Sequence, residues 1–219
     1  MKKIILTLTL MCLLFANSVF AHEVQNLSAD EAMKILKTGN EHFRTMHLNH
    51  PHQTKSSRDA LVKGQHPFVA ILTCSDSRVP AEIIFDQGLG DIFEIRNAGN
   101  VLDDHVIGSV EYAVVHLGVK LVIVMGHEDC GAVTATVNNV DETKYINSLI
   151  KSIKPALKQY EKEHQCGCKL TNVIKNNAVI NADKLTEKDG LLKDYVQNKG
   201  LKIVPAYYHL ESGEVEFLK

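Results

Sequence analysis

Residues 68–78 read FVAILTCSDSR and set the fold class of the chain. Within them, Phe68–Leu72 is a continuous apolar run, long enough for a β-strand that is buried on both faces. Asp91–Ile95 and Leu121–Met125 predict a second and a third strand. Between these two, Val106–Leu117 has apolar residues at helical spacing. Because strands alternate with helices, we expect an α/β fold with a mostly parallel central sheet and flanking helices.

The rest of the chain predicts more elements of both kinds. Ser28 and Glu31 form a capping-box pattern that begins a helix, and Gly39 is expected to end it. Residues 42–57 are polar and rich in histidine, which indicates an irregular surface arm. Further helices are predicted at Cys130–Val137, Tyr145–Glu163 (with a kink or break expected at Pro155), Leu170–Asn177 and Lys184–Asn198, and a closing β-hairpin at Lys202–Tyr208 and Glu214–Phe217.

The first 21 residues have the order of a secretory signal peptide. Lys2 and Lys3 precede an apolar run, and Val19 and Ala21 are small residues at the positions that a signal peptidase reads. The apolar run is too short for a comfortable membrane span, which needs about 20 residues. We therefore expect residues 1–21 to be removed, the mature chain to begin at His22, and the protein to be exported to a bacterial periplasm. An uncleaved anchor is the alternative.

The composition after residue 21 excludes some classes of partner. The signal carries two of the chain's 24 basic residues and none of its 26 acidic ones, so residues 22–219 are mildly acidic. A mildly acidic chain lacks the excess of positive charge that binds the phosphates of nucleic acid. No later segment is long and apolar enough to span a membrane. A hydrophobic content of 45% fits a single domain at 22–219 with a full core.

Residue types that bind metals stand where predicted strands end. Cys74 follows the first strand, and GHEDCG at residues 126–131, which contains His127 and Cys130, follows the third. In parallel sheets, sites form beyond the carboxyl ends of the strands. Two thiolates and one imidazole with an open fourth position match a catalytic zinc site. The alternative is that the cysteines are buried small residues or a disulfide, and that the histidine is a core residue.

Asp76 and Arg78 favour the metal site. They stand two residues apart on an extended segment, so their side chains share one face. An arginine can hold a carboxylate with two parallel hydrogen bonds. A carboxylate held beside a metal can become a fourth ligand or orient a metal-bound water. A simple ion pair is the plainer alternative.

Together these stretches resemble a known family. CSDSRV at residues 74–79 and HEDCG at residues 127–131 are similar to the two signature stretches of β-class carbonic anhydrases. FEIRNAGN at residues 93–100 is similar to that family's second strand and its turn. The resemblance runs from about Ser28 to Phe217, nearly the whole of the expected mature chain.

The resemblance implies a zinc (Zn2+) enzyme that reversibly hydrates carbon dioxide to bicarbonate and a proton. It implies that Cys74, His127 and Cys130 bind the metal and that a zinc-bound hydroxide is the nucleophile. Asp76 and Arg78 would orient that hydroxide, with Asp76 able to become a fourth ligand in a closed state. Alternatives on the same fold are hydrolysis of carbon disulfide or carbonyl sulfide, and zinc binding without catalysis.

The family also implies pocket and subunit positions. Gln65, Phe93, Ala98 and Tyr112 fall where its members line the substrate pocket, and Gln65 falls where plant-type members reach a neighbouring subunit's site. Gln65 and the absence of tryptophan favour the plant-type subgroup. We therefore expect a homodimer or a larger even homo-oligomer. The helix from Ser28 and the arm after it are expected to take part, because they have little of their own chain to pack on.

Two features lie outside this interpretation. Cys166 and Cys168 are compatible with a strained disulfide, with free thiols or with a redox or metal loop, and we favour surface thiols or a local bridge without a catalytic role. Histidines in and near the polar arm are interpreted as solvated side chains rather than as a second metal site: His42, His47, His50, His52 and His66.

Overall fold

The computed structural model describes residues 27–163, 167–187 and 190–219, so the predicted signal at residues 1–21 and Cys166 lie outside the described residues. A five-stranded sheet in the order β2-β1-β3-β4-β5 lies at the centre. Its strands are β1 (Val69–Cys74), β2 (Ile92–Asn97), β3 (Leu121–His127), β4 (Lys202–Tyr208) and β5 (Val215–Phe217). Strands β1 to β4 run parallel and β5 is antiparallel to β4, which confirms the mostly parallel sheet and the closing hairpin.

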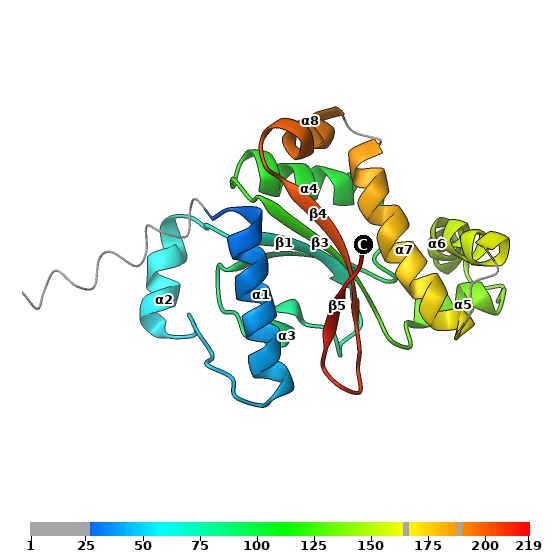
Figure 1. The fold of residues 1–219 in the computed structure, drawn as a ribbon, viewed down its shortest axis with the longest axis horizontal. Coiled ribbons are helices and arrows are strands. Elements are labelled where there is room, and N and C mark those ends of the chain that lie inside the picture. The colour runs from blue at the N-terminus through cyan, green and yellow to red at the C-terminus, as the bar shows by residue number, and fades with distance from the viewer. Residues whose placement is uncertain (1–26, 164–166, 188–189) are drawn as a thin grey trace, which may run out of the picture.

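Helices pack around this sheet (Figure 1). They are α1 (Ala29–Arg44), α2 (Lys55–Ala60), α3 (Ala81–Ile84), α4 (Asp104–Val115), α5 (Gly131–Val137), α6 (Lys144–Glu163), α7 (Lys169–Glu187) and α8 (Gly190–Asn198), with a short 3-10 turn, η2, at Leu61–Lys63. Helix α6 continues through Pro155 as one element, so the break considered there does not occur. Over the residues that the structure describes, no helix has the length and apolar character needed to cross a membrane.

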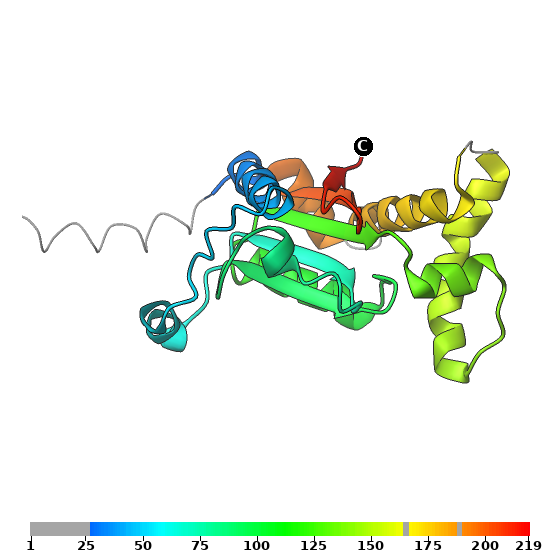
Figure 2. The same ribbon diagram turned by 90° about the horizontal axis from the view of Figure 1, so that it is seen from below.

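Each face of the sheet has its own core, because successive side chains of a strand point to opposite faces. Val69 and Ile71 pack with α1 and α3, whereas Ala70 and Leu72 pack with α4, α8 and the second half of α7. All of β1 is buried, which accounts for its unbroken apolar run. A third core joins α5, α6 and the first half of α7, on the side towards which the strand arrows point in Figure 2.

Helix α1 continues past Gly39, where we expected it to end. Gly39 is buried inside the helix, and a Cβ atom there would lie 1.7 Å from the carbonyl oxygen of Phe85. The glycine therefore permits close packing of α1 against the end of α3, and it does not stop the helix. Ala32 and Leu36 are buried on α1 as well. The expectation that this helix has little of its own chain to pack on is wrong.

The histidine-rich segment after α1 is attached to the fold. Nδ1 of His42 lies 3.1 Å from Oδ2 of Asp86, and Nδ1 of His52 lies 2.8 Å from Oδ2 of Asp91. Both aspartates are buried. These contacts attach the arm to the fold, although the side chain of His52 stays 55% exposed. The prediction of an irregular segment is wrong at residues 42–44, which belong to α1, and at residues 55–57, which belong to α2.

Residues 169–187 form one helix, where the sequence suggested Leu170–Asn177 and then Lys184–Asn198. The segment between those ranges is part of α7, and α8 begins only at Gly190. Leu185 is buried in the core between α7 and the sheet. Asn181 is buried too, and its Nδ2 donates to the carbonyl oxygen of Asn100 at 3.0 Å. The gap between the two predicted helices is therefore helical, and Asn181 within it is inside the protein and hydrogen-bonded.

Candidate metal centre

Three donor side chains meet at the carboxyl edge of the sheet. Cys74 is the last residue of β1 and His127 is the last residue of β3, and these neighbouring strands run parallel. Cys130 is the N-cap residue of α5, which follows β3 directly. The ligand atoms of the three side chains lie within 4.8 Å of one another, and all three residues are buried. The structure thus brings together the three residues that the sequence predicted as zinc ligands.

The imidazole of His127 is oriented for a metal. Its Nδ1 donates to the carbonyl oxygen of Glu128 at 2.8 Å, which leaves the lone pair of the ring on Nε2. Nε2 is buried, and no group in the described ranges forms a hydrogen bond with it. A buried acceptor without a partner is costly. A divalent metal bound to Nε2 would remove that cost.

The two thiols also fit a metal. Their Sγ atoms lie 4.0 Å apart, close to the separation of about 3.8 Å for two sulfurs on a tetrahedral zinc with bonds of about 2.3 Å. A hydrogen bond from Cys130, opposed by burial, lowers the pKa of Cys74 to about 4. The interaction with Cys74, together with burial, raises the pKa of Cys130. Only one of the two is easily ionised without a cation, and zinc between them would stabilise both as thiolates.

Asp76 and Arg78 form a tight pair beside these donors. Nε and Nη2 of Arg78 donate to Oδ1 and Oδ2 of Asp76 at 2.9 and 2.8 Å, and the backbone N–H of Arg78 adds a third hydrogen bond at 2.9 Å. Oδ2 of Asp76 lies 3.9 Å from Nε2 of His127. Hydrogen bonds from the Arg78 side chain, opposed by burial, hold the pKa of Asp76 well below its usual range. The carboxylate is therefore ionised, fixed in position and close to the donor atoms.

The loop after β2 supplies a hydrogen bond that sequence reasoning missed. The backbone N–H of Gly99 donates to Sγ of Cys74 at 3.3 Å. Gly99 has a φ of +77°, and a Cβ atom there would meet Ile153 at 2.8 Å and Ala132 at 3.0 Å. A side chain at this position would therefore be strained. The glycine indicated a tight turn in the sequence, but nothing local indicated its contact with a metal ligand.

Arg96 is a second contact that the sequence did not reveal. Its Nε donates to the carbonyl oxygen of Cys74 at 3.0 Å, and its Nη2 donates to that of Asp76 at 2.7 Å. Arg96 lies on β2, opposite Thr73 of β1. It therefore holds the backbone that joins a metal donor to the Asp76–Arg78 pair.

Three of the four predicted pocket residues lie on β2, its loop or α4. Ala98 is exposed in the loop after β2, and the backbone N–H of the next residue, Gly99, donates to Sγ of Cys74. The rings of Phe93 and Tyr112 contact each other with centroids 6.1 Å apart. Asn97 of β2 is paired with the donor Cys74. Phe93 comes four residues before Asn97 on the same strand, which places it about 13 Å from Asn97 at the usual rise per residue. Of these three, only Ala98 stands at the donors of its own chain.

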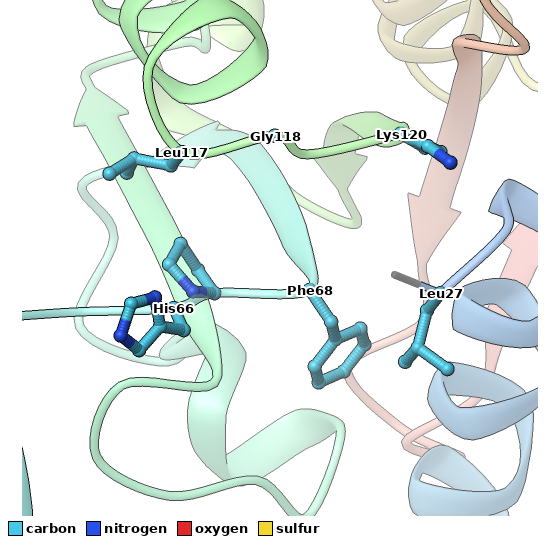
Figure 3. A pocket seen from close by; sticks show the side chains of 7 residues that line it. Leu27, His66, Phe68, Leu117, Gly118 and Lys120 are labelled. Atoms are coloured by element: carbon cyan, nitrogen blue, oxygen red, sulfur yellow. The ribbon is translucent and has the colours of Figure 1, made fainter. Parts of the chain in front are cut away.

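Gln65, the fourth pocket residue, lies near the amino ends of the strands, whereas the donors lie at the carboxyl ends. Its neighbour His66 borders a hollow of about 10 Å³ with Phe68 and Leu117, at the amino ends of β1 and β3 (Figure 3). Cys74 stands at the other end of β1, so a single chain does not bring Gln65 to the donors. The hollow itself has room for no more than a water molecule.

Cys168 stands apart from the metal centre. It is an exposed free thiol just before α7. Hydrogen bonds from Thr171 lower its pKa. Its sulfur is not part of the donor cluster, which is complete without it.

Comparison with known proteins agrees with this geometry. Residues 69–215 match the family model of carbonic anhydrase. Carbonic anhydrase 2 of Mycobacterium tuberculosis is 44% identical over 136 residues, which cover 60% of this chain and 66% of the relative. The carbonic anhydrase of Mycolicibacterium smegmatis is 44% identical over 130 residues, which cover 58% of this chain and 63% of the relative. The chain thus spans slightly less than two thirds of the length of these relatives.

Solved structures share the fold. The β-carbonic anhydrase CafA of Aspergillus fumigatus superposes with a TM-score of 0.68 at 28% identity, over 74% of this chain and 80% of that one. The β-carbonic anhydrase CcaA superposes with a TM-score of 0.68 at 26% identity, over 85% of this chain and 91% of that one. The family match includes the three donors, Asp76 and Arg78. From its donor cluster, its sheet and these matches, we conclude that the chain belongs to the β-carbonic anhydrase family.

Proposed function

We propose that this chain catalyses the reversible hydration of carbon dioxide to bicarbonate and a proton, with zinc bound by Cys74, His127 and Cys130. The observation that carries the proposal is the carboxylate of Asp76, which three hydrogen bonds from Arg78 hold beside the donors. A structural zinc site is closed by four protein ligands and has no use for such a pair. Membership of the family supports the same activity.

The residues around the donors have separate tasks in this reaction. Zinc at this position would supply a Lewis acid that makes hydroxide available near neutral pH. Asp76 would accept a hydrogen bond from the attacking hydroxide and so direct its lone pair at the carbon of the substrate. Arg78 would keep the carboxylate in that orientation and off the metal. The observed pairing of Asp76 with Arg78 supports the open, plant-type arrangement.

Carbon dioxide hydration by residues 22–219, followed by stopped flow with and without a zinc chelator, tests the proposal. We expect activity that the chelator abolishes and that added zinc restores. Carbonyl sulfide and carbon disulfide are tested as alternative substrates under the same conditions. A chain that binds zinc but leaves carbon dioxide hydration at the uncatalysed rate would contradict the proposed function.

We further propose that the active form is a homodimer or a larger even oligomer in which pocket residues come from a second copy. Tyr112 and Val115 on α4 are 47% and 39% exposed, and they border a hollow of about 240 Å³. Strand β2 lies beside them at the edge of the sheet. Exposed apolar side chains next to an open strand edge are typical of protein–protein contacts. Such a contact would allow Gln65 of one copy to reach the donors of the other.

Replacing Gln65 with alanine should therefore impair catalysis and leave zinc in place. We expect kcat/KM to fall about tenfold, which corresponds to the loss of one hydrogen bond to the substrate. The measurements are hydration kinetics, zinc content and sedimentation velocity. Gln53→Ala, which changes another exposed glutamine before β1, is the control and should have no effect. A monomer that keeps full activity on dilution would contradict the oligomer proposal.

Export is proposed from the signal at residues 1–21. The expected result is a mature protein that begins at or near His22 and is recovered in the periplasmic fraction, because Val19 and Ala21 match the cleavage pattern. Intact-mass analysis of the fractionated protein tests it. Detection of the complete chain from Met1 in that fraction would show that the signal is not cleaved.

A further inference from the structure

Helix α7 has three buried asparagines, Asn176, Asn177 and Asn181. Asparagine is a weak helix former, since its side chain competes with the backbone for hydrogen bonds. A buried amide is also costly unless it is hydrogen-bonded. Three such residues within two turns of one helix therefore require partners outside the helix.

Two of these asparagines contact the loop that follows β2. Nδ2 of Asn177 donates to the carbonyl oxygen of Gly99 at 3.0 Å, and Nδ2 of Asn181 donates to the carbonyl oxygen of Asn100 at 3.0 Å. The spacing of four residues places both side chains on one face of α7. Nδ2 of Asn181 also lies 3.4 Å from Oδ1 of Asn177. The pair thus binds two consecutive carbonyl groups of the loop.

The same loop contacts a zinc donor. The backbone N–H of Gly99 is the group that donates to Sγ of Cys74 at 3.3 Å. Gly99 and Asn100 both have positive φ, at 77° and 43°, a region that side chains disfavour. The conformation that points this N–H at the sulfur therefore needs support from outside the loop, and Asn177 and Asn181 provide it.

We propose that Asn177 and Asn181 are positioning residues for the zinc site: they hold the Gly99 N–H on the sulfur of Cys74. The inference rests on the proposed zinc site and adds to it two residues that no ligand motif contains. Apart from the other two donors and the backbone of Asp76, Cys74 packs in the apolar core that contains Val133 and Ile153. In such surroundings, a hydrogen bond to the charged form of the thiol stabilises it and fixes its direction.

Asn177→Ala and Asn181→Ala test the proposal, and Asn176→Ala is the matched control. Asn176 is a buried asparagine of the same helix, but its Nδ2 lies 3.4 Å from the carbonyl oxygen of Ala156 on α6, away from the loop. All three variants lose a buried amide, so all three should lower the unfolding midpoint. The variants are measured as zinc-loaded full-length proteins.

The zinc dissociation constant, from chelator competition, should rise up to about tenfold in Asn177→Ala. Tenfold is the lower end of what the loss of an outer-shell partner costs, and here that partner, the Gly99 N–H, is displaced rather than removed. It should rise less in Asn181→Ala and stay unchanged in Asn176→Ala. Cobalt substitution gives a second readout, because the thiolate-to-cobalt charge-transfer band reports on hydrogen bonding at sulfur. We expect that band to shift in the first two variants only. If Asn177→Ala does not fold, Asn181→Ala carries the test.

Equal zinc affinity and equal cobalt spectra in Asn177→Ala, Asn181→Ala and Asn176→Ala would overturn the inference and leave the proposed function intact. A wild-type chain that binds no zinc would overturn the proposed function, and the inference with it.

Discussion

Replacement of Cys74 by serine, His127 by alanine or Cys130 by serine should remove zinc and carbon dioxide hydration together. A site with three protein donors has no spare ligand. The zinc dissociation constant should rise by more than the roughly 10–100-fold that the loss of an outer-shell partner costs. Hydration should then fall to the rate that the chelated wild-type protein shows. Metal analysis after gel filtration and stopped-flow hydration measure the two effects.

Cys168→Ser is the control for these three variants. It removes a thiol as two of them do, but Cys168 is exposed and lies outside the donor cluster. We expect wild-type zinc content and hydration, and circular dichroism should show the same helix content in all four proteins. Wild-type zinc content in two of the three donor variants would show that the ligands are wrongly assigned.

Asp76→Asn and Arg78→Ala should keep zinc and lose most of the hydration activity. Neither residue is one of the three donors, so metal content should stay at the wild-type level. Asp76→Asn removes the anionic acceptor. Arg78→Ala removes the two side-chain hydrogen bonds to the carboxylate and leaves only the one from the backbone N–H of residue 78. We expect kcat to fall by about 10²–10⁴-fold, the usual contribution of a positioned acid–base group. Parallel measurement of kcat, KM and zinc content separates a catalytic loss from a loss of metal.

The charge state of Asp76 sharpens this prediction. Arg78 lowers the pKa of Asp76, so its removal should let that pKa return towards the usual value of about 4. The carboxylate would still be ionised at neutral pH. A loss of activity in Arg78→Ala at neutral pH therefore reports on the position of the carboxylate and not on its charge.

Asp30→Asn, which breaks the exposed ion pair with Lys202, is the control and should change neither hydration activity nor zinc content. Near-normal turnover in either Asp76→Asn or Arg78→Ala would reduce the pair to a structural ion pair.

Much of the fold was predictable because the pattern of apolar residues along a strand or helix shows which of its side chains are buried. The apolar runs that became β1 and β3 are buried over their whole length, and such runs are what a parallel sheet with helices on both faces requires. Two of the errors occurred where a glycine or an asparagine is buried for reasons of packing. Gly39 looked like a helix end but makes room for the backbone of Phe85. Asn181 lay in the gap between two predicted helices but is part of α7 and donates to the carbonyl oxygen of Asn100.

The donors were predictable for a different reason. Cysteine and histidine in polar surroundings at strand ends are rare without a chemical role, and parallel strands bring such ends to one edge. The pocket residues were only partly predictable within one chain. Ala98 lies at the donors, whereas Gln65 lies near the far edge of the sheet and Phe93 pairs with Tyr112 away from the site.

The sequence alone determined the residue types of the site, the order of the strands and of the longer helices along the chain, and the family that they indicate. The pairing of β1 with β3 determined which donors meet, and the packing of α7 determined that Asn177 reaches Gly99, a residue 78 positions away. The contact of Arg96 with the backbone of Cys74 likewise depends on the register of β2 against β1. Local periodicity reflects only which side of an element is buried. Contacts between distant residues depend on strand order and register, which are set when the whole sheet and its helices pack together.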